Sequence, residues 1–154
     1  MDRAWLKQAI EQATRNVLLG GGPFAAVVVK DGTAIAAGAN RVTATNDPTA
    51  HAEIVAIREA CRALGAFQLT GCDVYCSCEP CPMCLGALFW ARPARVFFAA
   101  TAADAAAAGF DDSLIYRQFA LPLAERFISM VHVADESAQR PFREWASQRD
   151  KVRY

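Results

Sequence analysis

The stretches His51-Ala52-Glu53 and Pro80-Cys81-Pro82-Met83-Cys84 decide how the fold of this chain is interpreted. One imidazole and two thiolates form the donor set of a tetrahedral zinc site whose fourth position is left for water. Three protein ligands are typical of catalytic zinc, whereas structural zinc has four. The sequence therefore predicts one zinc ion per chain, in a site built for hydrolysis.

The proposed ligands are His51, Cys81 and Cys84, and each falls near the start of an expected helix. Helical spacing over 82–90 places both cysteines at a helix N-terminus, where the positive end of the helix dipole favours thiolate over thiol. A second helix is expected to follow Asp47-Pro48, a good capping pair, and to run to about Leu64. Its first turn contains the histidine, so two helix N-termini should meet at the metal.

Glu53 is the expected proton carrier of this site. Bound zinc lowers the pKa of water from 15.7 to about 7, and a nearby carboxylate can take the released proton and return it to the substrate. Residues two apart lie nearly opposite one another on a helix. His51 and Glu53 can therefore share a site only if the metal lies at the helix end.

Three other interpretations of the cysteines stay open. Cys78 extends the motif to C-x-x-C-x-x-C, the opening of an iron–sulfur run, but Leu88 stands at the next expected ligand position. A C-x-x-C pair can also be redox active. Alternatively, Cys78 would be the fourth ligand of a structural zinc, which would leave Glu53 without a task. Three cysteines are interpreted simply as small buried side chains: Cys61, Cys72 and Cys76.

The composition favours a small-molecule enzyme over a nucleic-acid-binding protein. The chain has 154 residues, with 16 basic and 16 acidic side chains, so no bulk positive field attracts a phosphate backbone. Its length suits one domain over 1–154, and no apolar run approaches the roughly 20 residues that span a bilayer. The N-terminus lacks a signal-peptide pattern, which predicts a cytoplasmic location.

Apolar periodicity predicts an α/β fold with helices on both faces of a sheet. The first helix follows Asp2 and ends at Gly20-Gly21-Gly22, which matches no nucleotide-binding motif. A hairpin turns at Asp31-Gly32. The other expected strands are 73–77, 95–100 and 128–133, and the other expected helices are 102–108, 113–119 and 141–148.

The chain resembles the cytidine deaminase superfamily of zinc-dependent nucleobase deaminases, and within it the bacterial guanine deaminases. The resemblance extends over nearly the full length. Besides the zinc motif, the shared segments are Gly22-Pro23-Phe24, 46–53, 77–84, Trp90-Ala91-Arg92-Pro93, 108–113 and Tyr154. Segments 22–24, 46–53 and 77–84 also occur in tRNA adenosine deaminases, so the other three are more specific.

This resemblance implies a three-layer α/β/α fold with a mixed five-stranded sheet, and the hydrolysis of guanine to xanthine and ammonia. It also implies a homodimer in which the segment 137–154 is swapped onto the partner subunit. Beside the zinc ligands, it implies that Glu53 and Asp112 are catalytic. The residues that it implies for substrate binding are Phe24, Asn40, Trp90 and Tyr154.

Each of these outer residues also has an ordinary structural interpretation. Asp112 could cap the helix that follows it, and Asn40 could serve a turn at the end of a strand. Trp90 ends an apolar helix and could belong to the core. Tyr154 could lie in a frayed terminus.

Other functions stay open as well. A tRNA adenosine deaminase would need a basic surface, and residues 137–154 carry five basic against two acidic residues, a net +3 that a solvated helix face explains equally well. Guanosine or an aminotriazine could replace guanine as substrate. In a different class, the zinc could stabilise a module without catalytic activity, although the intact Glu53 argues against that.

Overall fold

The computed structural model describes residues 2–153, which divide into a first unit ending at Asp112 and a second unit beginning at Ser113. Within this described part of the chain, no helix is long and apolar enough to cross a membrane. The first unit contains a sheet and the residues of the zinc motif.

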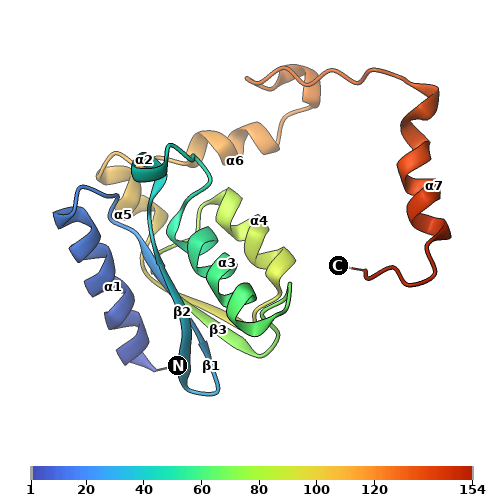
Figure 1. The fold of residues 1–154 in the computed structure, drawn as a ribbon. Helices are drawn as coiled ribbons and strands as arrows, with labels where there is room; N and C mark the ends of the chain where they lie inside the picture. Colours follow the sequence, from blue (N-terminus) through green and yellow to red (C-terminus); the bar gives the residue numbers. More distant parts are fainter. Residues whose placement is uncertain (1, 154) are drawn as a thin grey trace. The chain divides into compact units, whose positions relative to one another are not determined.

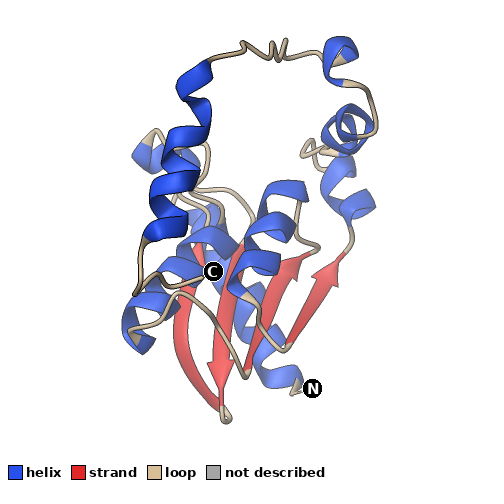
Figure 2. Ribbon diagram, turned by 90° about the vertical axis from the view of Figure 1, so that its right-hand side faces the viewer, coloured by secondary structure: helices blue, strands red, loops and turns tan. Residues whose placement is uncertain are grey.

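A mixed four-stranded sheet forms the centre of the first unit, with strand order β2-β1-β3-β4 (Figure 2). The strands are β1 (Ala25–Lys30), β2 (Thr33–Ala39), β3 (Cys72–Cys78) and β4 (Arg95–Ala100). Strand β1 is antiparallel to both neighbours, while β3 and β4 are parallel. The hairpin between β1 and β2 turns at Asp31-Gly32 with positive φ angles, as predicted.

Helices cover both faces of this sheet, in agreement with the expected three layers (Figure 1). On one face, α1 (Arg3–Leu18) buries Ala9 against Val27, Val29 and Tyr75. On the other face, the alternate strand positions Ala26, Val28 and Val74 share a core with α3 (Ala52–Leu64) and α4 (Pro82–Ala91). The period of two along β1 thus divides its side chains between two cores.

Helix α3 begins at Ala52 and not at Pro48, so the predicted start was wrong. The side chain of Asp47 accepts hydrogen bonds from the Thr49 amide at 2.8 Å and the Thr49 hydroxyl at 2.7 Å. Aspartate is favoured both in such local turns and at helix N-caps, because its side chain accepts nearby backbone N–H groups in either case. The turn is formed here, after a short helix α2 (Val42–Thr45) that was not predicted.

The other helices of the first unit agree with the sequence. Helices α1 and α4 were predicted, and α5 (Ala102–Ala107) follows β4 directly. The side chain of Thr101 accepts the Asp104 amide, and the Asp104 carboxylate accepts the Thr101 amide, forming a capping box at the start of α5. Residues Phe110 and Asp112 come after this helix and end the unit.

The second unit is helical, and the expectation of a fifth strand at 128–133 was wrong. Its elements are α6 (Ser113–Phe119), the 3₁₀ helices η1 (Leu123–Glu125) and η2 (Glu136–Gln139), and α7 (Arg140–Ser147). The apolar side chains of 128–133 are largely exposed, with Ile128 at 76% and Val131 at 77%. Strand propensity reflects the fit of a side chain to a half-buried pleated surface, and residues 128–133 pair with no strand among the described residues.

The packing of α3 on β2 gives a test of the fold. A Cβ atom at Gly38 would lie 2.4 Å from the Ala52 carbonyl oxygen and 2.6 Å from the Ala56 nitrogen, both in the backbone of α3. Gly38→Ala should therefore lower the free energy of unfolding by about 1–3 kcal/mol, as overpacking does. Denaturant unfolding measures this change.

Gly86→Ala is the matched control, because a Cβ there meets no atom within 4 Å and Gly86 lies inside α4. It should raise the free energy of unfolding by up to about 1 kcal/mol through helix propensity. A Gly38→Ala variant as stable as the unsubstituted chain would contradict the described contact between α3 and β2.

Candidate active site

The site is built at one edge of the sheet. Because β1 runs against its neighbours, its first residue lies beside the last residues of β2 and β3, and the register pairs Ala25 with Ala39 and Cys78 with Ala100. Helix α3 begins in the segment that follows β2, and α4 begins just after β3. The carboxyl ends of parallel strands are the usual ligand-binding edge of α/β sheets.

Two helix N-termini bring the predicted metal ligands together here. His51 is the N-cap residue of α3 and Cys81 that of α4, both with extended backbone, and Cys84 lies three residues into α4. The ligand atoms of these three residues all lie within 4.8 Å of one another, with 3.5 Å between His51 Nδ1 and Cys81 Sγ. Tetrahedral zinc with bonds of about 2.0 and 2.3 Å separates a nitrogen from a sulfur ligand by about 3.5 Å and two sulfur ligands by about 3.8 Å. The cluster therefore fits a zinc ion.

The two cysteines differ in acidity. The thiol of Cys84 donates a hydrogen bond to Cys81 and, with His51, lowers the pKa of Cys81 to about 4. The same bond and burial raise the pKa of Cys84, and the Cys81 thiolate raises the pKa of His51. A preformed thiolate at a helix N-terminus is a ready metal ligand, and ligation of the second thiol then releases its proton.

Glu53 lies beside the cluster without belonging to the ligand set. It is the second residue of α3, is only 7% exposed, and its carboxyl group hydrogen-bonds the side chain of Cys84. Burial raises the pKa of this carboxyl group. Because His51 sits at the N-cap position with extended backbone, its side chain and that of Glu53 reach the same site.

Phe24, Asn40 and Asp112 lie at the same edge. The Asn40 amide donates to the Phe24 carbonyl oxygen at 3.0 Å, which joins the end of β2 to the start of β1. The ring of Phe24 meets the ring of Phe110 edge to face, with centroids 5.0 Å apart. Asp112 is partly buried, and desolvation together with the charge of Cys81 raises its pKa.

The structure does not bring Trp90 to this cluster within one chain. Trp90 lies near the C-terminal end of α4, and a rise of about 1.5 Å per residue places it about 13 Å along the axis from Cys81. It is also 64% exposed, so the core interpretation does not hold either. Tyr154 lies outside the described residues.

Cys78 is not part of the metal cluster. Among residues 2–153, the grouped metal-binding side chains at this edge are His51, Cys81 and Cys84 alone. The thiol of Cys78 instead donates to the Thr101 carbonyl oxygen at 3.6 Å. This placement argues against a four-ligand structural site and against an iron–sulfur cluster.

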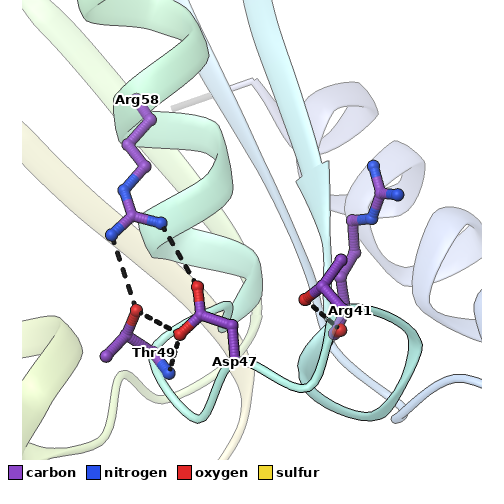
Figure 3. A network of polar contacts seen from close by, with 5 residues as sticks. Arg41, Asp47, Thr49 and Arg58 are labelled. Atoms are coloured by element: carbon purple, nitrogen blue, oxygen red, sulfur yellow. Dashed lines mark hydrogen bonds and ion pairs between the residues drawn. The ribbon is translucent and has the colours of Figure 1, made fainter.

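The turn that precedes His51 is held by an ion pair (Figure 3). Arg58 of α3 lies 3.8 Å from the Asp47 carboxylate and donates to the Thr49 hydroxyl at 3.5 Å. The hydrogen bonds from Thr49 lower the pKa of Asp47, with the charge of Arg58 adding to them. Because the network is exposed, it contributes little to the free energy of folding. Its effect is to set the direction of the chain before His51.

Sequence reasoning missed two polar residues that shape the site, Glu79 and Asn16. The Glu79 carboxylate accepts the Ala102 amide at 2.9 Å, which fixes the start of the segment leading to Asp112. The Asn16 side chain donates to two backbone carbonyls at the ends of β1 and β2. Glu79 lies in the shared segment 77–84, but the sequence indicated no role for either residue, because each acts on backbone that is distant in sequence.

Comparison with known proteins agrees with this geometry. The family model for the cytidine and deoxycytidylate deaminase zinc-binding region matches residues 1–100. The chain belongs to this deaminase family. This deaminase is 54% identical over 151 residues to guanine deaminase of Bacillus subtilis (strain 168), with 97% of each chain covered. The X-ray structure of guanine deaminase from Bacillus subtilis matches with a TM-score of 0.98 at 53% identity, over 100% of this chain and 99% of that one.

Two other matches are more limited. The tRNA-specific adenosine deaminase of Aquifex aeolicus is 45% identical over 96 residues, covering 62% of this chain and 64% of that protein. A solved structure in complex with 2,6-diaminopurine matches with a TM-score of 0.68 at 38% identity, over 71% of this chain and 61% of that one.

Removal of one thiol tests the ligand set. Cys81→Ala or Cys84→Ala should lose zinc, measured by elemental mass spectrometry, and should also lower the melting temperature, because metal binding contributes to the free energy of folding. Cys61→Ala is the control, since Cys61 lies on α3 outside the cluster and should keep a full complement of zinc. A Cys84→Ala variant that binds zinc as the unsubstituted chain does would remove Cys84 from the set.

Proposed function

We propose that this deaminase hydrolyses guanine to xanthine and ammonia, with one zinc ion per chain held by His51, Cys81 and Cys84. The observation that carries the proposal is the similarity to guanine deaminase of Bacillus subtilis over 97% of the chain. That similarity covers 151 of the 154 residues and so continues well beyond residue 100, where the family model ends and a substrate-specific part of the chain would lie. A neighbour that binds 2,6-diaminopurine supports a purine as ligand.

A tRNA substrate is the second candidate and is less well supported. The similarity to the tRNA-specific adenosine deaminase of Aquifex aeolicus covers only 62% of this chain. The net charge of zero offers no attraction to an RNA backbone, which otherwise dominates such affinities.

The proposed reaction divides the work among groups at the sheet edge. Zinc, when bound, makes water a nucleophile at neutral pH. Glu53 takes one proton from the attacking water and delivers it to the ring nitrogen. It then takes the second proton, from the hydroxyl group that the water has become on the ring carbon, and delivers it to the amine, which departs as ammonia while the carbonyl group of xanthine forms. Its burial suits this task, because a raised pKa lets the carboxyl group both accept and return a proton. Asp112 would accept a hydrogen bond from the amine, while Asn40 and Phe24 hold the purine.

We also propose that two copies of this deaminase assemble, with the segment 137–154 swapped onto the partner subunit. Large apolar side chains of the second unit are exposed in the single chain, among them Phe127 at 86% and Phe142 at 67%. Apolar side chains that form a contiguous exposed patch mark a protein interface, and we propose that those of the second unit do so. Tyr154 would then contact a purine bound at the zinc site of the partner subunit. Trp90, which is distant from the zinc ligands of its own chain, would do the same.

We propose in addition that this deaminase is located in the cytoplasm. All six cysteines of the chain are free thiols, and thiols persist in reducing compartments.

Ammonia release from guanine tests the function directly. The zinc-loaded protein should release ammonia from guanine and not from adenine, cytosine, cytidine or tRNA, and guanosine in the same panel decides between base and nucleoside.

Glu53→Gln should keep zinc while losing about 10² to 10⁴ in rate, because the three ligands remain and the proton carrier is removed. No ammonia from guanine would refute the proposal, and substantial turnover by Glu53→Gln would refute the role of Glu53.

Asp112→Asn separates the catalytic role of Asp112 from helix capping. Asparagine keeps the shape and the capping ability of aspartate but not its charge. The variant should lose at least about tenfold in kcat with little change in melting temperature, since only an interaction in the reaction is removed. Asp111→Asn, one residue earlier, is the control and should keep the kcat of the unsubstituted chain. A parallel fall in melting temperature and activity would support the capping role instead.

Deletion of Lys151 to Tyr154 tests the swapped tail. The truncated chain should keep its zinc and its fold but lose most of its activity on guanine, because a purine site needs an aromatic face and exclusion of water. Mixing it with Cys81→Ala under subunit exchange should restore one complete site per hybrid dimer. An active truncated chain would contradict the role of the tail in purine binding, and an inactive hybrid would contradict the swap.

A further inference from the structure

The side chain of Asn16 connects two segments at the sheet edge that are distant in sequence. Asn16 lies in the last turn of α1, and its amide nitrogen donates to the Gly22 carbonyl oxygen at 2.8 Å and to the Asn40 carbonyl oxygen at 2.9 Å. A side-chain amide has two donor hydrogens, so both are used here. One residue of α1 therefore ties the start of β1 to the end of β2.

The neighbouring glycines are fitted to this arrangement. A Cβ at Gly21 would lie 2.4 Å from Asn16 Nδ2, and a Cβ at Gly22 would lie 3.1 Å from both Cγ and Oδ1 of Asn40. The sequence predicted these glycines only as the end of a helix. The structure shows in addition that two of them leave space for the side chains of Asn16 and Asn40.

Asn40 is left with free hydrogen-bonding capacity. Its backbone is fixed on both sides, because its amide donates to Phe24 and its carbonyl accepts from Asn16. Its Oδ1 accepts the Val42 amide at 3.3 Å, and within residues 2–153 its Nδ2 group has no hydrogen-bond partner. A rigid backbone that presents an unused amide group is suited to bind a polar ligand with little loss of conformational entropy.

We propose that Asn16 is a positioning residue for purine recognition, which it supports by holding the backbone of Asn40, with Gly21 and Gly22 providing the space. The proposal rests on the assignment of Asn40 to purine binding under the proposed function. Asn16 itself does not touch the substrate. Its loss should therefore weaken purine binding and leave the chemistry at His51, Cys81 and Glu53 unchanged.

A double-mutant cycle tests this role in the zinc-loaded protein. Asn16→Ala should raise KM for guanine about tenfold, the equivalent of one lost positioned hydrogen bond, with kcat and zinc content nearly unchanged. In an Asn40→Ala background, Asn16→Ala should have almost no further effect on KM, because residues that act through one another are not additive. Additive effects on KM would overturn the proposal.

Two further variants guard against a purely structural explanation. Asp2→Ala removes the cap at the other end of α1, where Asp2 accepts the Ala4 amide at 2.9 Å, and should lower the melting temperature without changing KM. Gly22→Ala leaves Asn16 intact and should reproduce the rise in KM by displacing Asn40. An unchanged KM in Gly22→Ala, or an equal rise in Asp2→Ala, would contradict the positioning role. If the unsubstituted protein releases no ammonia from guanine, the proposed function fails instead.

Discussion

The meeting of two helix N-termini at one edge of the sheet is the constraint on which the rest of the site depends. His51 and Cys81 occupy equivalent N-cap positions, with extended backbone, on α3 and α4. The hydrogen bond from the Cys84 thiol, together with His51, stabilises the Cys81 thiolate. The positive end of a helix favours a thiolate as well, so one ligand is already charged before a metal binds. The same helix start places Glu53 in a buried position next to the ligands, where its carboxyl group hydrogen-bonds the side chain of Cys84.

The sheet gathers the other residues of the proposed site because β1 runs against its neighbours. Phe24 before β1, Asn40 after β2 and Cys81 after β3 are widely separated in sequence, yet the strand register places them at one edge. Gly38 lets α3 approach β2 closely, which fixes the helix start that carries His51 and Glu53. Asn16 then ties the ends of β1 and β2 together. The active site is thus a consequence of strand direction and of a few close backbone contacts.

Much of the first unit could be predicted from the sequence, because its signals are local. Neighbouring residues are enough to indicate the turn at Asp31-Gly32, the helix α1 through its apolar periodicity, and the helix start at Cys81-Pro82. The start of α3 was misplaced because Asp47 can cap a helix or close a turn, and here it closes a turn with Thr49. The strand expected at 128–133 was wrong because a strand needs a partner that this sequence segment does not specify. Asn16 gave no signal, since its two acceptors come together only in the folded chain.

X-ray absorption at the zinc edge of the loaded protein tests the central claim most directly, because the claim is that three protein ligands leave one position open. The account predicts two sulfur ligands at about 2.3 Å, one imidazole nitrogen at about 2.0 to 2.1 Å and one light oxygen ligand. The spectrum should be unchanged in Cys78→Ala. A third sulfur ligand, lost in Cys78→Ala, would show a closed structural site and would contradict the account.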